Sequence, residues 1–287
     1  MESTRRDFCR VFGLGLASAM VGIPDTAYAS SLESKIESCL SEKIDGGKLT
    51  RHETIAFLVH DYVAGKTIVS RNAHVPMQTA SMVKPFVALA YFHGVRNGLY
   101  RYTAVNMKRL MWMLRDSCNH STNLIMRSLG GPDEVHHLLI DNYPHIFKQM
   151  SIVEYIPKGG KTYKNMASAD DYNRFLQELW AQRLPYSDKI LRYMHLPNND
   201  RIYKRVKSIP KETLVYDKSG TTGMLCGNMG LLSAKGKDGK RYPYNIIGII
   251  QRDRRADGVC WQYSRGWIIR ELSGIVYEHM KKKYGLI

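Results

Sequence analysis

The order in which β-rich and helical segments follow one another limits the folds that this chain can adopt. Residues 54–60 and 66–70 are rich in β-forming side chains, and Ala64-Gly65 between them predicts a hairpin. Helical patterns dominate the middle of the chain, and β-rich segments return after Pro210, at 213–217, 227–234 and 244–251. Strands near both ends of a chain can share one sheet when the helices between them form an insertion. We therefore expect an α/β fold of the α+β type, in which an antiparallel sheet is flanked by helices and joined to an all-helical subdomain.

Caps and breakers mark several helix boundaries within this pattern. Ser168-Ala169-Asp170-Asp171 is a capping box, which predicts a helix that ends near Trp180. Pro132 follows two glycines and can open a new helix. Further helices are expected at 31–44, 81–94, 108–114, 121–129 and 265–280, and the polar segment 235–240 predicts a hairpin turn.

The first 29 residues have the pattern of an export signal. Thr4-Arg5-Arg6-Asp7-Phe8-Cys9-Arg10 contains paired arginines, and Ala27-Tyr28-Ala29 offers small residues for cleavage. The apolar run between them has 13 residues, 11–23, whereas a membrane-spanning helix needs about 20. We therefore predict export by the twin-arginine route to the periplasm or the extracellular space, without a stable membrane anchor.

The remaining residues, 30–287, are expected to form a single catalytic domain. Its α/β part would comprise about 30–80 and 205–287, and its helical subdomain about 81–204. The formal net charge of the chain is +16, which favours anionic surroundings such as peptidoglycan. A nucleic-acid partner is not expected, because the chain is predicted to be exported and carries none of the common nucleic-acid-binding motifs. We expect a monomer, although the sequence leaves the oligomeric state open.

The cysteine and histidine patterns point to no metal or cofactor. The predicted mature chain keeps four cysteines, Cys39, Cys118, Cys226 and Cys260, whose wide spacing leaves any disulfide pairing open. Neither a C-x-x-C nor an H-E-x-x-H pattern occurs.

Ser81 and Lys84 are the first candidates for chemistry. They are three residues apart at the start of a predicted helix, so their side chains share one face. A serine hydroxyl becomes a nucleophile when a base accepts its proton, and a lysine held neutral by burial can do so. The alternative is structural: Ser81 would cap the helix and Lys84 would extend its amine to solvent.

Two further motifs follow in the order that penicillin-recognising serine enzymes share. Ser117-Cys118-Asn119 lies between two predicted helices, and Lys218-Ser219-Gly220 follows a β-rich segment. Around them, MLRDSCNHSTNLIMRSLGGPDEV from Met113 and VYDKSGTTG from Val215 extend the match. The chain resembles the class A serine β-lactamases and the related D-alanyl-D-alanine peptidases over most of residues 30–287.

The resemblance implies a role for each residue at a matching position. Ser81 would be the acylated nucleophile and Lys84 its proton partner. Ser117 would relay a proton to the leaving nitrogen, and Lys218 would supply positive potential. Substrate binding would involve Asn119, Ser219, Gly220 and Thr221, with an oxyanion hole formed by the backbone N–H groups of Ser81 and Thr221. The expected ligands are β-lactams or D-Ala-D-Ala-like peptides.

Three departures from the family pattern bear on activity. Ser81 and Ser117 are 36 positions apart, fewer than in class A enzymes, and Cys118 replaces the usual aspartate. We interpret Cys118 as a buried structural thiol. Glu154 stands near the place of the family's deacylating glutamate, but Lys158 stands where the E-x-x-x-N pattern requires asparagine.

These departures leave more than one function open. The main prediction is a serine hydrolase that forms an acyl-enzyme at Ser81, with Glu154 as a candidate base for deacylation. The alternatives are a penicillin-binding cell-wall peptidase with slow deacylation and a non-catalytic protein that binds β-lactams or peptidoglycan.

Overall fold

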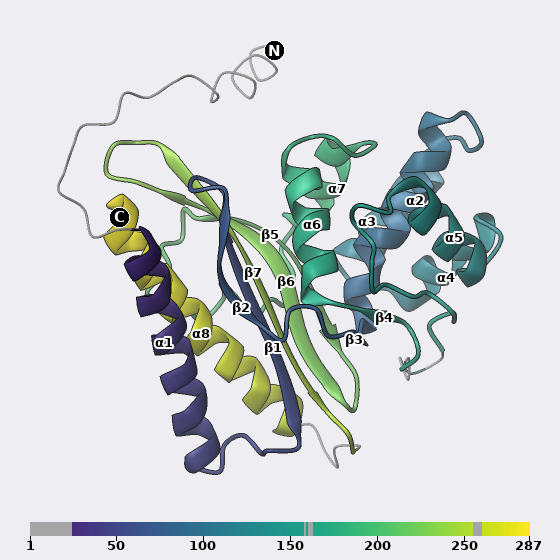
Figure 1. Cartoon of the computed structure of the whole chain (residues 1–287). Helices are drawn as coiled ribbons and strands as arrows, with labels where there is room; N and C mark the ends of the chain where they lie inside the picture. The colour runs from purple at the N-terminus through teal and green to yellow at the C-terminus, as the bar shows by residue number, and fades with distance from the viewer. Residues whose placement is uncertain (1–24, 158, 160–162, 255–259) are drawn as a thin grey trace.

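A five-stranded antiparallel sheet lies between two layers of helices (Figure 1). This arrangement is seen in the computed structural model, which describes residues 25–157, 159, 163–254 and 260–287. The strand order is β2-β1-β7-β6-β5. The strands are β1 (Glu53–Asp61), β2 (Lys66–Arg71), β5 (Leu214–Thr221), β6 (Leu225–Lys235) and β7 (Arg241–Arg252). Because β1 pairs with β7, strands from both ends of the chain meet in one sheet, as the sequence predicts.

Two long helices cover one face of the sheet. They are α1 (Asp25–Asp45) and α8 (Cys260–Tyr284), drawn in purple and yellow in Figure 1. Leu32 and Ile36 of α1 and Leu272 of α8 are fully buried in a core with the apolar side chains of the sheet. Burial of these apolar side chains away from water stabilises the packing of α1 and α8 on the sheet.

The helical part covers the opposite face. Its central helix α2 (Lys84–Arg96) is buried on all sides along most of its length, as expected for a helix enclosed by others. The elements around it are the 3₁₀ turn η2 (Ala80–Val83), α3 (Ala104–Leu114), α4 (Asn119–Ser128), α5 (Pro132–Asn142), α6 (Ala169–Trp180) and α7 (Ser187–Met194). A short sheet of β3 (Met77–Gln78) and β4 (Met166–Ala167) joins the two parts.

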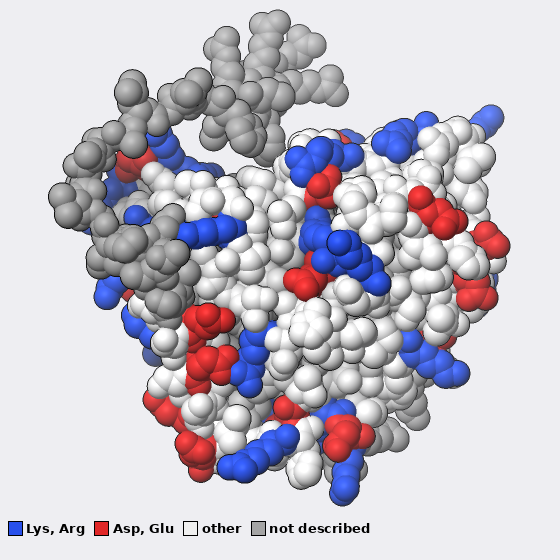
Figure 2. Space-filling model, viewed as in Figure 1, with Lys and Arg blue, Asp and Glu red and all other residues white. Residues whose placement is uncertain are grey.

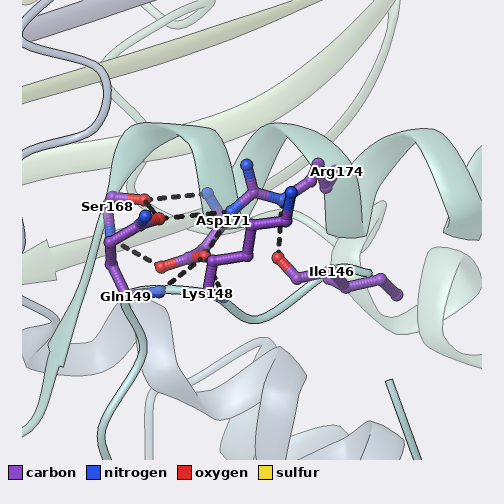
Figure 3. A network of polar contacts seen from close by, with 6 residues as sticks. All are labelled: Ile146, Lys148, Gln149, Ser168, Asp171 and Arg174. Carbon is purple, nitrogen blue, oxygen red and sulfur yellow. Dashed lines mark hydrogen bonds and ion pairs between the residues drawn. The ribbon is translucent and has the colours of Figure 1, made fainter. Parts of the chain in front are cut away.

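The N-terminus of α6 is held by a network of polar contacts (Figure 3). Ser168 and Asp171 form the predicted capping box, in which each side chain accepts a hydrogen bond from the backbone N–H of the other. The buried Asp171 also accepts a hydrogen bond from the backbone N–H of Lys148 at 2.9 Å and one from Arg174 at 2.5 Å. Arg174 in turn donates to the carbonyl of Ile146. The segment after α5 is thereby fixed to α6.

Several boundaries differ from those expected. Helix α7 was not expected from the sequence, and α1 begins at Asp25 instead of residue 31. Residues 1–24 of the predicted export signal lie outside the described residues, whereas the backbone of 25–29 forms the first turn of α1. The division into an α/β part and a helical subdomain stays a prediction.

Surface and thiol features complete the description. In the described part of the chain, no helix is both long enough and apolar enough to cross a membrane. The four cysteines in the described ranges are free thiols, so none of them pairs with another. Figure 2 shows Lys and Arg side chains spread over the visible face among acidic and uncharged residues, without one continuous basic patch.

Candidate active site

The turn that carries Ser81 packs directly on the sheet, and two glycines make this approach possible. A Cβ atom added at Gly220 of β5 would lie 2.9 Å from the carbonyl oxygen of Thr79 and 3.0 Å from Cγ of Met82. One added at Gly227 of β6 would lie 2.8 Å from Cε of Met82. All three separations are shorter than ordinary van der Waals contact. Gly220 therefore lets β5 lie against the turn, which brings the Lys218-Ser219-Gly220 segment next to Ser81.

Ser81 and Lys84 are in direct contact. Ser81 lies in η2, and Lys84 is the first residue of α2. The Nζ atom of Lys84 lies 2.9 Å from Oγ of Ser81. Ser81 caps neither helix, because the N-cap positions are Thr79 and Val83. Lys84 does not reach solvent either, since it is 0% exposed. The alternative in which Ser81 caps the helix and Lys84 extends its amine to solvent is therefore wrong.

Lys84 also bonds to the Ser117-Cys118-Asn119 segment. Its Nζ lies 2.9 Å from Oγ of Ser117, 2.6 Å from the carbonyl oxygen of Ser117 and 2.8 Å from Oδ1 of Asn119. Ser117 has a φ of 56°, in the left-handed region, between α3 and α4. This backbone conformation is uncommon for a residue other than glycine, and here it accompanies contact of both Ser117 oxygens with one amine. Ser117 and Asn119, which are distant from Lys84 in sequence, thus meet Ser81 at the Lys84 amine.

The surroundings of Lys84 disfavour its charged form. Burial lowers the pKa of Lys84 well below its usual value, and the positive charge of Lys218 acts in the same direction. The side-chain and backbone atoms that bond to its amine are neutral oxygens, so none of these bonds is an ion pair. A neutral lysine amine within hydrogen-bond distance of a serine hydroxyl can accept its proton.

Cys118 differs from the expected buried thiol. It is half-buried and is the N-cap of α4, where its Sγ accepts hydrogen bonds from the backbone N–H and the hydroxyl of Ser121. Burial raises the pKa of Cys118, but the hydrogen bonds from Ser121 and from the backbone N–H of His120 act against it, and the pKa lies below the usual value. The thiol takes the capping role that a side-chain oxygen usually has.

Lys218 and Ser219 line an open cavity beside Ser117. The cavity has a volume of about 390 Å³, and its walls are formed by Arg115, Asp116, Ser117, Pro197, Asn198, Asn199, Lys204, Lys218 and Ser219. Lys218 is 2% exposed. Burial lowers the pKa of Lys218 to about 8, with the charge of Arg201 acting in the same direction and that of Asp217 against it. The cavity therefore combines two serine hydroxyl groups with three cationic residues and one acidic residue.

A buried polar network supports the strand that carries Lys218. Asp217 accepts hydrogen bonds from the side-chain amides of Asn198 and Asn228 at 2.9 and 3.0 Å. Burial raises the pKa of Asp217 above its usual value, and the charge of Asp200 adds to this effect. The amide donors satisfy a carboxylate that would otherwise be costly to bury.

Arg201 contacts the candidate site, although no sequence motif points to it. Its Nη2 donates to Oγ1 of Thr221 at 2.5 Å, and its Nη1 donates to the carbonyl of Gly227 at 3.0 Å. A guanidinium group therefore lies beside the residue that the resemblance assigns to carboxylate binding. No spacing in the sequence signals this contact, because Arg201 and Thr221 come from a loop and a strand that meet only in the fold.

Glu154 is bound to the loop that follows it. Its Oε1 accepts hydrogen bonds from the backbone N–H groups of Tyr163 and Lys164 at 2.8 and 3.0 Å. Helix α4 holds the same loop two residues later, where the side chain of Asn123 donates to the carbonyl of Ile156 at 2.8 Å and accepts from its N–H at 2.9 Å. The loop residue whose backbone Asn123 binds is therefore the apolar, buried Ile156. These hydrogen bonds of the Glu154 carboxylate go to its own loop, whereas Ser81, Ser117 and Asn119 all bond to the amine of Lys84.

Comparisons with known proteins identify the family and the fold of the chain. A sequence profile of the family described as "Beta-lactamase enzyme family" matches residues 100–280, more than half of the chain. The chain belongs to the beta-lactamase enzyme family. No curated protein matches this family member by sequence.

Solved structures identify its fold as that of the class A β-lactamases. A structure described as PBP-A is similar with a TM-score of 0.70 and 18% sequence identity, covering 88% of this chain and 97% of that chain. A variant of PBP-A with the same scores is described as an acyl-enzyme complex with penicillin G. A class A β-lactamase from Bacteroides cellulosilyticus DSM 14838 has a TM-score of 0.69 and 17% identity, covering 89% of this chain and 99% of that chain.

Proposed function

We propose that this β-lactamase family member is an exported serine hydrolase that forms an acyl-enzyme at Ser81. The observation that carries the proposal is the buried amine of Lys84, within hydrogen-bond distance of the hydroxyls of both Ser81 and Ser117. In acylation, Oγ of Ser81 attacks the amide carbonyl carbon while Lys84 accepts the hydroxyl proton. The carbon–nitrogen bond then breaks, and the leaving nitrogen receives a proton through Ser117.

The proposed substrates carry a carboxylate next to the amide that is acylated. β-Lactams and D-Ala-D-Ala-like peptides share this feature. Lys218 would provide positive potential, and the hydroxyls of Ser219 and Thr221 would donate to the carboxylate, with the Arg201 guanidinium beside them. Asn119 would bind the amide on the acyl side, and the backbone N–H groups of Ser81 and Thr221 would form the oxyanion hole. Export by the twin-arginine signal would bring the protein to its peptidoglycan substrates.

We further propose that the acyl-enzyme is hydrolysed slowly. A deacylating base must reach the ester through one water molecule. The carboxylate of Glu154 accepts hydrogen bonds from the backbone N–H groups of Tyr163 and Lys164, and the loop position clamped by Asn123 is the apolar Ile156. Slow release of the acyl group favours a penicillin-binding peptidase over an efficient β-lactamase.

A time course of intact mass with benzylpenicillin tests both parts of the proposal. We expect one covalent adduct whose lifetime is much longer than the turnover time of a typical β-lactamase. We expect no adduct on Ser81→Ala. A transient adduct with rapid product release would contradict slow deacylation and leave acylation at Ser81 in place. The absence of any adduct on the folded protein would contradict the proposed function.

The competing function is non-catalytic binding of β-lactams or peptidoglycan. It predicts that Ser81→Ala keeps the affinity for benzylpenicillin and that no mass change occurs. Against it, a binding protein gains nothing from burying both Lys84 and Lys218, because burial of a cation costs free energy. Equilibrium binding to wild type and Ser81→Ala, measured beside the mass time course, separates the two functions.

A further inference from the structure

A second cavity lies beyond Thr221, between the loop around residue 200 and the N-terminal half of α8. Its volume is about 410 Å³. Its walls are formed by Asn199, Asp200, Arg201, Lys204, Arg205, Gln262, Tyr263, Gly266 and Arg270. We call this cavity the basic pocket, because four of the nine lining residues are cationic and one is acidic.

Among the residues that the structure describes, the cations of the basic pocket have no carboxylate partner. Within the described ranges, none of the four forms an ion pair. Arg270 donates to the backbone carbonyls of Lys204 and Asp200 at 2.8 and 2.6 Å. Oδ1 of the buried Asp200 accepts hydrogen bonds from three backbone N–H groups of the loop, those of Ile202, Tyr203 and Lys204. The guanidinium groups of Arg201 and Arg270 are thus held in place by neutral oxygens, and no acid among the described residues pairs with them.

Gly266 allows two of these cations to approach each other. A Cβ atom added there would lie 3.3 Å from Nε of Arg201 and 3.3 Å from Nη1 of Arg270. Both guanidinium groups therefore lie against the same glycine. Burial lowers the pKa of Arg270, and the charges of Arg201 and Arg205 act in the same direction while Asp200 opposes them. Like charges fixed this closely create a strong positive potential that an anion relieves.

The basic pocket continues the catalytic cavity. Asn199 and Lys204 line both, and Arg201 reaches from the basic pocket to the hydroxyl of Thr221. In the proposed function, the carboxylate at Ser219 and Thr221 belongs to the part of the substrate that leaves on acylation. Atoms that extend from this leaving part past Thr221 would therefore enter the basic pocket.

We propose that the basic pocket receives a second anionic group, carried by the leaving part of the substrate. This inference rests on the proposed function and narrows its substrate class to acyl amides whose leaving amine bears two carboxylates. One carboxylate would lie at Ser219 and Thr221, and the other between Arg270 and Arg205. The planar guanidinium groups suit a carboxylate, which they can bind through paired hydrogen bonds.

Two matched peptides test the inference. They share one acyl part that ends in D-alanine at the scissile bond, and their leaving residues are D-glutamate and D-glutamine, which differ in one charge but hardly in size. The kcat/KM for release of the leaving residue is measured for each. Where cleavage is too slow, the dissociation constants are taken from the slowing of benzylpenicillin acylation. We expect wild type to favour the D-glutamate peptide by about tenfold, the effect of one charge-assisted hydrogen bond.

Two substitutions identify the pocket as the source of that preference. Arg270→Gln and Arg205→Glu are both expected to abolish it. Arg205 is exposed, so Arg205→Glu is the variant whose folding is safest, and thermal melting checks both. Lys237→Glu is the control, because it makes the same charge change in the exposed hairpin between β6 and β7. We expect this variant to keep the preference for the D-glutamate peptide.

The outcomes separate this inference from the proposed function. If benzylpenicillin acylates the wild-type protein but the two peptides give equal kcat/KM values or dissociation constants, the inference is overturned and the proposed function stands. The same loss of preference in Lys237→Glu as in Arg205→Glu would also overturn it, because net charge would then be the cause. A protein that neither reacts with benzylpenicillin nor cleaves either peptide would overturn both.

Discussion

Buried cations occur on both faces of the sheet, but they have different partners. On the face covered by α1 and α8, the side chain of Arg265 is 11% exposed and donates through Nε and Nη2 to both oxygens of Glu53, each at 2.6 Å. Trp261 adds a third hydrogen bond to the same carboxylate. On the opposite face, Lys84 is 0% exposed and Lys218 is 2% exposed. The bonds of their amines go to hydroxyl, carbonyl and amide oxygens.

The Glu53–Arg265 pair favours its charged form, whereas the surroundings of Lys84 favour its neutral form. Glu53 has a lowered pKa, because the hydrogen bonds and charge of Arg265 outweigh burial, so this ion pair stays charged and links the start of β1 to α8. Burial lowers the pKa of Lys84 well below its usual value and that of Lys218 to about 8, so both amines lose their proton more readily than an exposed lysine does. Burial beside a carboxylate keeps Arg265 charged and supports the fold, whereas burial among neutral oxygens prepares the amine of Lys84 for proton transfer.

Lys84→Met should break the reactive side of this comparison and have the largest effect. Methionine keeps the length and burial of the side chain but cannot accept a proton. We expect the second-order rate of acylation by benzylpenicillin to fall by about 10²–10⁴-fold, the usual contribution of a general base. Stopped-flow kinetics and intact mass measure this loss. A variant that acylates at the wild-type rate would show that Lys84 is not the base.

Arg265→Met should break the structural side. Removing one partner of a buried ion pair leaves the other charge uncompensated, and we expect the free energy of unfolding to fall by about 3–5 kcal/mol. Acylation by the folded fraction should keep its rate, because Arg265 lies on the face of the sheet away from Ser81. Denaturant unfolding compares this variant with Lys84→Met, whose stability should fall less because it leaves no buried charge. The reverse order of stabilities would contradict the contrast between the two faces.

The pH dependence of acylation should sharpen the difference between the two lysines. Lys84 must be neutral to accept a proton, so the second-order rate rises as pH increases through its lowered pKa. Lys218 must be charged to attract the substrate carboxylate, so the rate falls as pH rises above its pKa of about 8. Lys218→Arg should move the fall to higher pH, because an arginine keeps its charge there. A fall near pH 8 that persists in Lys218→Arg would assign it to another group.

Glu154→Gln should have the smallest effect on the chemistry. The carboxylate is bound to backbone N–H groups of its own loop, so we expect the lifetime of the penicilloyl adduct to stay unchanged. The lifetime is read from intact mass after removal of free benzylpenicillin. Asn123→Ala is the matched comparison, because it removes both bonds that hold Ile156 and should loosen the loop. A longer-lived adduct in Glu154→Gln with unchanged thermal stability would restore Glu154 as the deacylating base.

The fold could be predicted well where local sequence signals agree with tertiary packing. The capping box at Ser168 marks the start of α6, and the β-rich segments near both ends of the chain form one antiparallel sheet. Helix α7 escaped prediction because it is short and has no side-chain cap, with Tyr186 at the N-cap position. Its formation depends on burial of Ile190 and Tyr193 against the rest of the fold.

The candidate site could be predicted only in part from its motifs. Ser81, Lys84, Ser117 and Asn119 occupy motif positions. The structure brings Ser81, Ser117 and Asn119 within hydrogen-bond distance of the Lys84 amine. Arg201 could not be found in this way. It reaches Thr221 through a contact between a loop and a strand, and no fixed spacing along the chain encodes such a contact.

The sequence by itself determined the order of the elements, the motif residues and the glycine at position 220, because each of these depends on local spacing or side-chain size. Tertiary structure alone decided the protonation preference of Lys84, the position of Glu154 and the basic pocket. A pKa depends on burial and on charges that approach from distant segments. The same holds for a cavity, since Arg201 and Arg270 meet at Gly266 only after α8 packs beside the loop around residue 200.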